Sequence, residues 1–303
     1  MPNAKEIKGR INSIKETRKI TNAMYLISSN KLRKAEEELK KTRPYFNAVQ
    51  KEIKRVFCVD ENIENKYFYP PDGNPDLDGA YGYLVITADK GLAGAYNQNI
   101  LKETVRLMQK HSGFNDELYV VGEYGRHYFT SHGINIEKSF LYTAQNPTMR
   151  RAREICYTLL DRYEQGKLVK IYIIYTDYSG SMSTRVCSTR LLPFQRAKFI
   201  SGDEEQEELN RADFEFEPSL GKVLDNIVPG YITGFIYSAL VDSFCSEQNA
   251  RMTAMDSANT NADEILSQLS MQYNHVRQGA ITQEITEVSS GARSRRAKNE
   301  REA

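Results

Sequence analysis

The chain has 303 residues, and its 41 Lys and Arg residues nearly balance its 40 Asp and Glu residues, giving a formal net charge of +1. This balance excludes a protein that binds polyanions through its overall charge, so any electrostatic site must be local. The four cysteines are scattered singly, which predicts a reduced compartment and no zinc site. We find no signal peptide and no stretch close to the roughly 20 apolar residues of a membrane span, and expect a soluble or membrane-peripheral protein.

The first 60 residues are predicted to form one very long helix. From Ala4 to about Val59 there is no Gly after Gly9 and a single Pro, Pro44, where we expect a bend. The predicted coiled-coil seam has apolar residues every 3 or 4 positions: Ile7, Ile11, Ile14, Ile20, Met24, Ile27, Leu32, Ala35, Leu39, Phe46, Val49, Ile53 and Val56. This seam requires register shifts near Arg18 and Asn30.

A second long helix is predicted near the carboxyl end. Residues 231–288 contain no Pro and only two Gly, and the same 3 and 4 spacing of apolar residues continues through them. A helix of this length would be on the order of 80 to 90 Å long and needs a partner helix. We expect Pro218 near its start and a break at Pro229. Its seam is rich in small residues, which favours a slim rod.

The intervening block is predicted to be a different kind of structure. Four short runs rich in β-branched and aromatic residues, 81–88, 117–123, 169–178 and 185–194, are typical strands, and helical stretches alternate with them. This alternation predicts a mostly parallel sheet covered by helices. The fold class is therefore α+β with a Rossmann-like α/β insert and a long antiparallel coiled coil, divided into 1–60, 61–217 and 218–303.

No catalytic, cofactor-binding or metal-binding residues are predicted. The glycine cluster TADKGLAGAYNQN lies between a strand and a helix but lacks the spacings of phosphate-binding loops, so a tight turn is the better interpretation. Ser179, Ser181 and Ser183 have no GxSxG elbow around them. A nucleotide-dependent enzyme is one alternative. A second is a coiled-coil adaptor that binds nucleic acid through the basic first helix, most basic at Lys31–Ala35.

Three ordered motifs resemble one family. ITNAMYLISSNKLRKA at residues 20–35 is similar to the amino-terminal signature of the bacterial F-type ATP synthase gamma subunit, and TADKGLAGAYN is similar to its central glycine motif. The most specific match is SEQNARMTAMDSANTNADEILSQLSMQYNHVRQGAITQEITEV, residues 246–288. The resemblance extends over nearly the whole chain.

The resemblance implies a non-catalytic central rotor stalk, with one copy in each complex. Its two helices would turn inside a ring of three alpha and three beta subunits, and the α/β domain would dock with the epsilon subunit on the c-ring. Ion flow through the c-ring would turn the stalk and drive ATP synthesis on beta, and ATP hydrolysis would turn it in reverse. The chain would bind no cofactor and no nucleic acid, and would be peripheral on the cytoplasmic side of the cell membrane.

The resemblance also implies which residues couple rotation to catalysis. Contacts with beta are implied for Arg277 and Gln278, with Thr282 and Glu284 close to them, and coupling is associated with Met24 lying against the opposite helix. Lys31, Arg33 and Lys34 would face an acidic loop of beta. His275 stands where the family often has Arg or Lys. The basic tail, residues 289–303, would be costly inside an apolar sleeve, so we expect it to emerge and be disordered.

Overall fold

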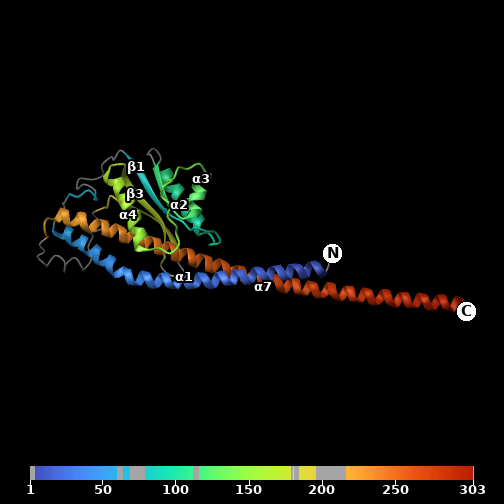
Figure 1. Ribbon diagram of the computed structural model, residues 1–303. Helices are drawn as coiled ribbons and strands as arrows, with labels where there is room; N and C mark the ends of the chain where they lie inside the picture. Colours follow the sequence, from blue (N-terminus) through green and yellow to red (C-terminus); the bar gives the residue numbers. More distant parts are fainter. Residues whose placement is uncertain are drawn as a thin grey trace. The chain divides into compact units, whose positions relative to one another are not determined.

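The computed structural model describes residues 4–59, 64–68, 79–111, 116–178, 180, 184–195 and 216–302, with side chains at 58, 59 and 294–302 left out. Two long helices form the ends of the sequence, and the segment between them in sequence forms an α/β domain (Figure 1). The described elements are α1 (Ala4–Val59), β1 (Ala80–Ile86), α2 (Tyr96–Lys110), β2 (Asp116–Val121), α3 (Glu123–Ser131), α4 (Met149–Glu164), β3 (Leu168–Tyr178), β4 (Thr184–Leu192) and α7 (Leu220–Glu302).

The fold prediction is confirmed. The sheet has the order β2-β1-β3-β4, in which β1 pairs parallel with β2 and with β3, and β4 pairs antiparallel with β3. Every residue of β1 after Ala80 is buried, as expected for a parallel strand covered on both sides. The serines Ser179, Ser181 and Ser183 lie outside the described residues.

The chain divides into two compact units. One comprises residues 28–251 and contains the α/β domain, and the other combines residues 1–27 with 252–303. Both long helices contribute to both units. The three-part division at 60 and 217 remains a prediction.

The core of the 28–251 unit lies between the sheet and its helices. Tyr81, Tyr83 and Val85 of β1 pack with Ile100 and Leu101 of α2 in one buried cluster. α7 also joins the sheet, because the Thr176 amide of β3 donates to the Ser243 hydroxyl at 3.2 Å. The described elements of this domain therefore bury apolar side chains together and satisfy backbone groups at the helix contact.

Close approach of α1 and α7 within this unit depends on a glycine. A Cβ on Gly234 would lie 2.1 Å from Cδ1 of Phe46, so only glycine lets the ring pack against the α7 backbone. Phe46 also contacts Tyr237, with ring centroids 6.2 Å apart. The small residue thus permits the tight helix pairing that the sequence suggested.

Three expectations about α7 are wrong. Pro229 does not break it, because the helix runs from Leu220 to Glu302. The flanking Val228 and Ile232 are almost fully buried, and their packing offsets the cost of about 3 kcal/mol for an interior proline. The tail is helical through Glu302 rather than disordered, consistent with its Ala, Arg, Lys and Glu residues, which are strong helix formers.

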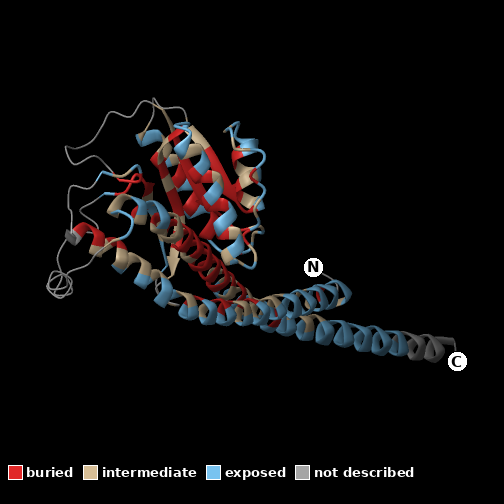
Figure 2. Cartoon of the chain, turned by 60° about the vertical axis from the view of Figure 1, so that its left-hand side comes forward, coloured by how far each residue is buried: buried red, intermediate tan, exposed pale blue. Residues whose placement is uncertain are grey.

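The third wrong expectation is that no stretch of the chain comes close to the hydropathy of a membrane span. α7 contains an 18-residue window with a mean hydropathy of 1.2. By length and composition alone, this helix is long and apolar enough to cross a membrane. However, 67% of that window is buried inside the molecule, as in the core helix of a soluble fold. Figure 2 shows the change along α7 from mostly buried residues beside the sheet to exposed residues toward the carboxyl end.

Candidate functional site

The smaller unit is an antiparallel helix pair with a polar gap. Arg18 of α1 lies 2.6 Å from the Asp263 carboxylate of α7, and the Thr21 hydroxyl donates to the Asn259 side-chain oxygen. The gap has a volume of about 580 Å³, and its lining residues are Lys15, Arg18, Lys19, Asn22, Asp256, Asn259, Thr260 and Asp263. The side chains that join the two helices at this level are therefore polar.

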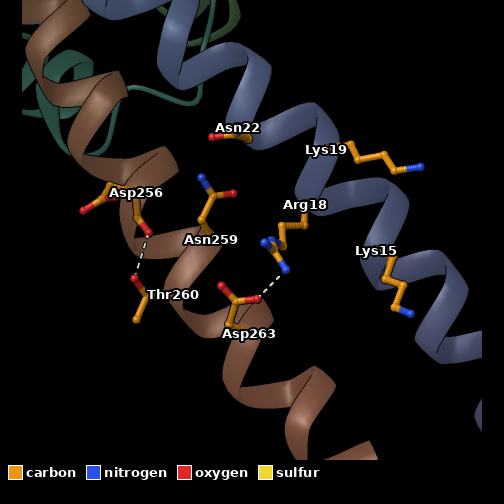
Figure 3. A pocket seen from close by; sticks show the side chains of 8 residues that line it. All are labelled: Lys15, Arg18, Lys19, Asn22, Asp256, Asn259, Thr260 and Asp263. Carbon is orange, nitrogen blue, oxygen red and sulfur yellow. Dashed lines mark hydrogen bonds and ion pairs between the residues drawn. The ribbon is translucent and has the colours of Figure 1, made fainter. Parts of the chain in front are cut away.

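Figure 3 shows how these side chains are directed. Arg18 reaches toward Asp263, whereas Lys15 and Lys19 extend away from α7. Lys19 is paired on its own helix with Glu16 at 2.8 Å. The gap consequently offers no free cluster of cations, and we do not interpret it as an anion site.

The seam on α1 differs from the predicted one. Ile20 and Ile27 are 62% and 57% exposed, so they lie outside the seam, and Leu26 is exposed as well. Ile7 is buried, and Ile11, Ile14 and Thr21 are half-buried. These positions, with Arg18, keep alternating steps of 4 and 3, so no register shift near Arg18 is needed.

The observed helix pairing leaves the apolar side chains of Ile20 and Ile27 mostly unburied. Fully burying one isoleucine side chain is worth about 1.5 to 3 kcal/mol, and because Ile20 and Ile27 are 62% and 57% exposed, about 2 to 4 kcal/mol of that burial is unused in the isolated chain. Sequence reasoning placed both in the seam because apolarity was the only signal it used. Met24 is half-buried beside them.

The predicted coupling residues of α7 lie beyond the end of its pairing with α1. Ala4 lies 14 residues before Arg18, so in the antiparallel register it faces the residue 14 after Asp263, Arg277. About 25 residues of α7 therefore extend past α1, or about 38 Å of single helix. This single-helix part of α7 is called the overhang. Gln278, Thr282 and Glu284 are on this overhang and are exposed, as is Arg277. The Thr282 hydroxyl donates to the Gln278 carbonyl at 2.9 Å.

The overhang also carries an exposed apolar stripe, which the sequence analysis did not predict. Ile281, Ile285 and Val288 are 47%, 64% and 74% exposed and follow one another at steps of 4 and 3. They share one face of the helix, and no described residue of α1 lies far enough along to cover it. The sequence carried no signal for it, because the two predicted helical segments, the first 60 residues and residues 231–288, are nearly equal in length.

The basic residues of the amino-terminal signature lie in the other unit. Lys31 is half-buried, while Arg33 and Lys34 are exposed. Arg33 is held loosely, 3.8 Å from Glu37. A pocket of about 210 Å³ adjoins them, with lining residues Lys31, Lys34, Ala35, Glu38, Asn146, Pro147, Tyr237, Val241 and Phe244. The structure thus places the eight predicted contact residues in two units, not in one site.

The glycine loop is fixed by α7 rather than arranged around a phosphate. The Arg251 guanidinium donates to the carbonyls of Lys90 and Gly91, at 3.4 and 3.1 Å. Arg251 is itself paired with buried Glu247 at 2.6 Å. Burial raises the pKa of Glu247, and the charge of Arg251 opposes that shift. Inward-facing loop carbonyls and a carboxylate partner are typical of a structural turn, because a phosphate site needs free amide donors and free positive charge.

Asp89 fixes the far side of the same loop. Its carboxylate accepts hydrogen bonds from the amides of Glu123, Ala144 and Gln145, at 3.1 to 3.2 Å, and from the Thr143 hydroxyl. These bonds join the loops at the carboxyl ends of β1 and β2 into one rigid edge. In the described part of the chain, no three His, Cys, Asp or Glu residues are grouped as a metal site.

One buried carboxylate on α7 lacks full pairing. Asp242 is 6% exposed; its Oδ2 atom lies 3.5 Å from the Ser238 hydroxyl, and its Oδ1 atom has no hydrogen-bond partner among the described residues. The pKa of Asp242 is raised to about 7, chiefly by burial and next by the charge of Asp177, while Arg43 and the Ser238 hydroxyl oppose the shift. This group therefore titrates near neutral pH.

The family model described as ATP synthase matches residues 3–294. An ATP synthase gamma chain from Caldanaerobacter subterraneus subsp. tengcongensis is 42% identical over 294 residues, covering 95% of this chain and 98% of the relative. This chain belongs to the ATP synthase gamma chain family. The predictions of a central stalk subunit and of a non-catalytic chain are thereby confirmed. As such, it is part of a membrane-associated complex.

Solved structures agree on the fold. One chain of the Tetrahymena thermophila mitochondrial ATP synthase, determined as central stalk and c-ring, has a TM-score of 0.58 and 24% identity, covering 79% of this chain and 99% of its own length. A chain of the Euglena gracilis mitochondrial enzyme, determined with OSCP, F1 and c-ring, has a TM-score of 0.63 and 16% identity, covering 97% of this chain and 95% of its own.

Proposed function

We propose that the chain turns as a shaft inside a ring of alpha and beta subunits and couples ion flow through the c-ring to ATP synthesis on beta. Its α/β domain would dock with the epsilon subunit and the c-ring, one copy would serve each complex, and the complex would lie on the cytoplasmic side of the cell membrane. The observation that carries this proposal is the overhang of α7. It leaves Arg277, Gln278, Thr282 and Glu284 exposed beside an apolar stripe, as a surface that a surrounding partner must cover.

Several contacts are needed to do this work. Driving a catalytic subunit from 1:99 to 99:1 between two states takes about 5.5 kcal/mol of differential interaction. One hydrogen bond contributes only about 1 kcal/mol net. The polar overhang residues, the half-buried Met24 and the basic group Lys31, Arg33 and Lys34 together can supply enough contacts that form in one orientation only.

The first test is assembly. The full chain, expressed with the alpha and beta subunits of its own organism, is expected to co-purify with them at one copy per complex. Salt-dependent binding to a generic DNA duplex, with no affinity for alpha and beta, would support the nucleic-acid adaptor instead.

The second test is coupling. Met24→Lys in the assembled complex is expected to weaken proton-driven ATP synthesis more than ATP hydrolysis, because a charge at this half-buried position disturbs the shaft contact without touching the catalytic sites. Met271→Lys, which adds the same charge at a side chain that is 64% exposed, is the matched control. Equal losses of synthesis and hydrolysis in Met24→Lys would reduce Met24 to a structural residue.

A further inference from the structure

A small pocket of about 210 Å³ lies in the larger unit, where α1, α7 and the loop before α4 meet. Its lining residues recur at helical spacing on each helix, so each helix contributes one face, and the loop closes a third side. They are Lys31, Lys34, Ala35 and Glu38 of α1, Tyr237, Val241 and Phe244 of α7, and Asn146 and Pro147 of the loop.

The floor of this pocket is apolar and recessed. Val241 and Phe244 are 1% and 4% exposed, and Ala35, which also lines the pocket, is buried as well. At about 30 Å³ for each water molecule, the volume holds about seven waters or a ligand of roughly ten non-hydrogen atoms. An apolar floor of this extent favours an organic ligand over an inorganic ion.

The polar side chains around this floor are unpaired donors. Within the part of the chain that the structure describes, neither Lys31 nor Lys34 forms an ion pair. The side-chain amide of Asn146 and the hydroxyl of Tyr237 have no hydrogen-bond partner there either. Four donors therefore line one small pocket without an acceptor, which is the arrangement that fixes the orientation of a bound ligand.

The carboxylates close to these lysines are already paired. Glu38, which lines the pocket, is bonded to Lys41 at 2.7 Å. Burial raises the pKa of Glu247 and the charges of Arg251 and Lys31 oppose that shift, but the Glu247 carboxylate is bonded to Arg251 at 2.6 Å. The pocket therefore keeps positive charge that the described residues do not neutralise.

The loop wall of the pocket is fixed before any ligand binds. The Arg151 guanidinium donates to three carbonyls of this loop at 2.6 to 3.2 Å, one of them that of Asn146. The Asp89 carboxylate accepts hydrogen bonds from two amides of the same loop. Asn146 itself has a left-handed φ of +48°, a conformation that is found preferentially at ligand sites. A wall held in this way lowers the ordering cost of binding.

We propose that this pocket binds a small organic acid, a carboxylate joined to an apolar body of about six to eight carbon atoms. The carboxylate lies between the ammonium groups of Lys31 and Lys34, with the Asn146 amide and the Tyr237 hydroxyl as further donors. The apolar body rests on the recessed floor. Binding of this kind needs only the folded chain and is independent of the proposed rotor function.

A carboxylate is also present on the acidic side chains of partner subunits, and Lys31 and Lys34 are predicted to face beta. The recessed floor favours a free acid instead. An Asp or Glu side chain pairs with lysines at the rim without supplying an apolar group that reaches Val241 or Phe244.

The test measures the binding of 4-fluorobenzoate to the full-length chain by fluorine NMR. The expected Kd is on the order of 1 mM, as for a ligand of about ten non-hydrogen atoms. 4-Fluorobenzamide has nearly the same shape but no charge, and we expect it to bind at least about tenfold more weakly. No binding of 4-fluorobenzoate at concentrations up to about 20 mM, or equal binding of the two compounds, would overturn the proposal.

Substitutions locate the bound acid. Lys31→Met with Lys34→Met is expected to weaken the binding of 4-fluorobenzoate at least about tenfold. The matched control is Lys40→Met with Lys102→Met, which removes two exposed charges outside the pocket and is expected to keep the parent affinity. Equal weakening in the control pair would mean attraction by overall charge and would overturn the proposal.

Folding of each variant is checked by near-ultraviolet circular dichroism. If the double lysine variant does not fold, Lys34→Gln at its exposed position must weaken binding about threefold or more for the proposal to stand. Val241→Leu, which extends an apolar side chain over the floor, is expected to weaken the binding of 4-fluorobenzoate without changing the charge. Unchanged affinity in folded Val241→Leu would place the probe elsewhere and overturn the proposal.

The assembled complex separates a free acid from a partner side chain. With alpha and beta bound, 4-fluorobenzoate is expected to bind with the affinity measured on the free chain. Loss of binding in the complex would overturn the assignment to a free acid, because it would mean that a partner covers the pocket. Failure of the chain to assemble with alpha and beta would refute the proposed function, while the binding measured on the free chain would stand.

Discussion

Replacement of Asp242 by Asn should stabilise the protein, and should do so increasingly as the pH rises. Asp242 is 6% exposed on α7, and the charged or titratable groups that face it are Asp177 and Tyr175 of β3, Cys187 of β4, Arg43 of α1 and Cys245 of α7 itself. Burial raises the pKa of Asp242 from its ordinary value of 3.8 to about 7. Asn has nearly the same shape but carries no charge at any pH.

The sign follows from proton binding. Between about pH 4 and pH 7 the folded protein keeps the Asp242 proton while the unfolded chain releases it, so stability falls as the pH rises through this range. The full cost, reached above pH 7, is about 4 kcal/mol for a shift of about 3 pKa units. Asn removes this cost. We expect a gain in unfolding free energy of about 2 kcal/mol at pH 5 and about 4 kcal/mol at pH 8.

The assay is urea unfolding of the full chain at pH 5, 6, 7 and 8. The chain has no Trp, so near-ultraviolet circular dichroism of the packed tyrosines reports the state of the larger unit. Asp256→Asn, at an exposed position of the same helix, is the control and should change little at any pH. A pH-independent gain, or a loss of stability at pH 8, would refute the reasoning, because it would mean that Asp242 is ionised and well paired in the fold.

Other predictions follow from single contacts. Gly122→Ala should destabilise the domain by more than about 2 kcal/mol in the same assay, because its φ is +95° and a Cβ would lie 2.4 Å from the Thr87 carbonyl oxygen. The control, Gly221→Ala, has open space around its Cβ and should not destabilise the domain. Arg251→Met should cost about 3 to 5 kcal/mol by leaving Glu247 buried without its partner, and Glu247→Gln added to it should recover part of that loss; no recovery would count against the ion-pair explanation. Truncation after Gly291 should leave assembly with alpha and beta intact, as judged by co-purification, since the polar and apolar contact residues of the overhang all precede it. His111→Phe should reduce the loss of stability between pH 7 and pH 5, because burial lowers the pKa of His111 and the unfolded chain takes up its proton first as the pH falls; an unchanged pH profile would exclude this contribution.

The sequence by itself determined the two long helices and the sheet between them. Steps of 3 and 4 with few Gly and Pro, and short β-branched runs flanked by helical stretches, are local patterns that specify local structure. The ordered motifs also identified the family, which the comparisons confirmed. The continuation of α7 through Pro229 could not be foreseen, because it depends on the burial of Val228 and Ile232 against residues distant in sequence.

Only the tertiary structure decided which face of α1 forms the seam. Ile20 and Ile27 are more apolar than Thr21, so hydropathy alone puts them inside. The face that turns inward also carries Ile7, Ile11 and Ile14, and at the level of Thr21 and Arg18 it meets Asn259 and Asp263, some 240 residues further along the chain. In the same way, the exposed overhang exists because α1 begins opposite Arg277 while α7 continues to Glu302. Both features arise from pairing between distant segments, and a pattern within one segment carries no information about its partner.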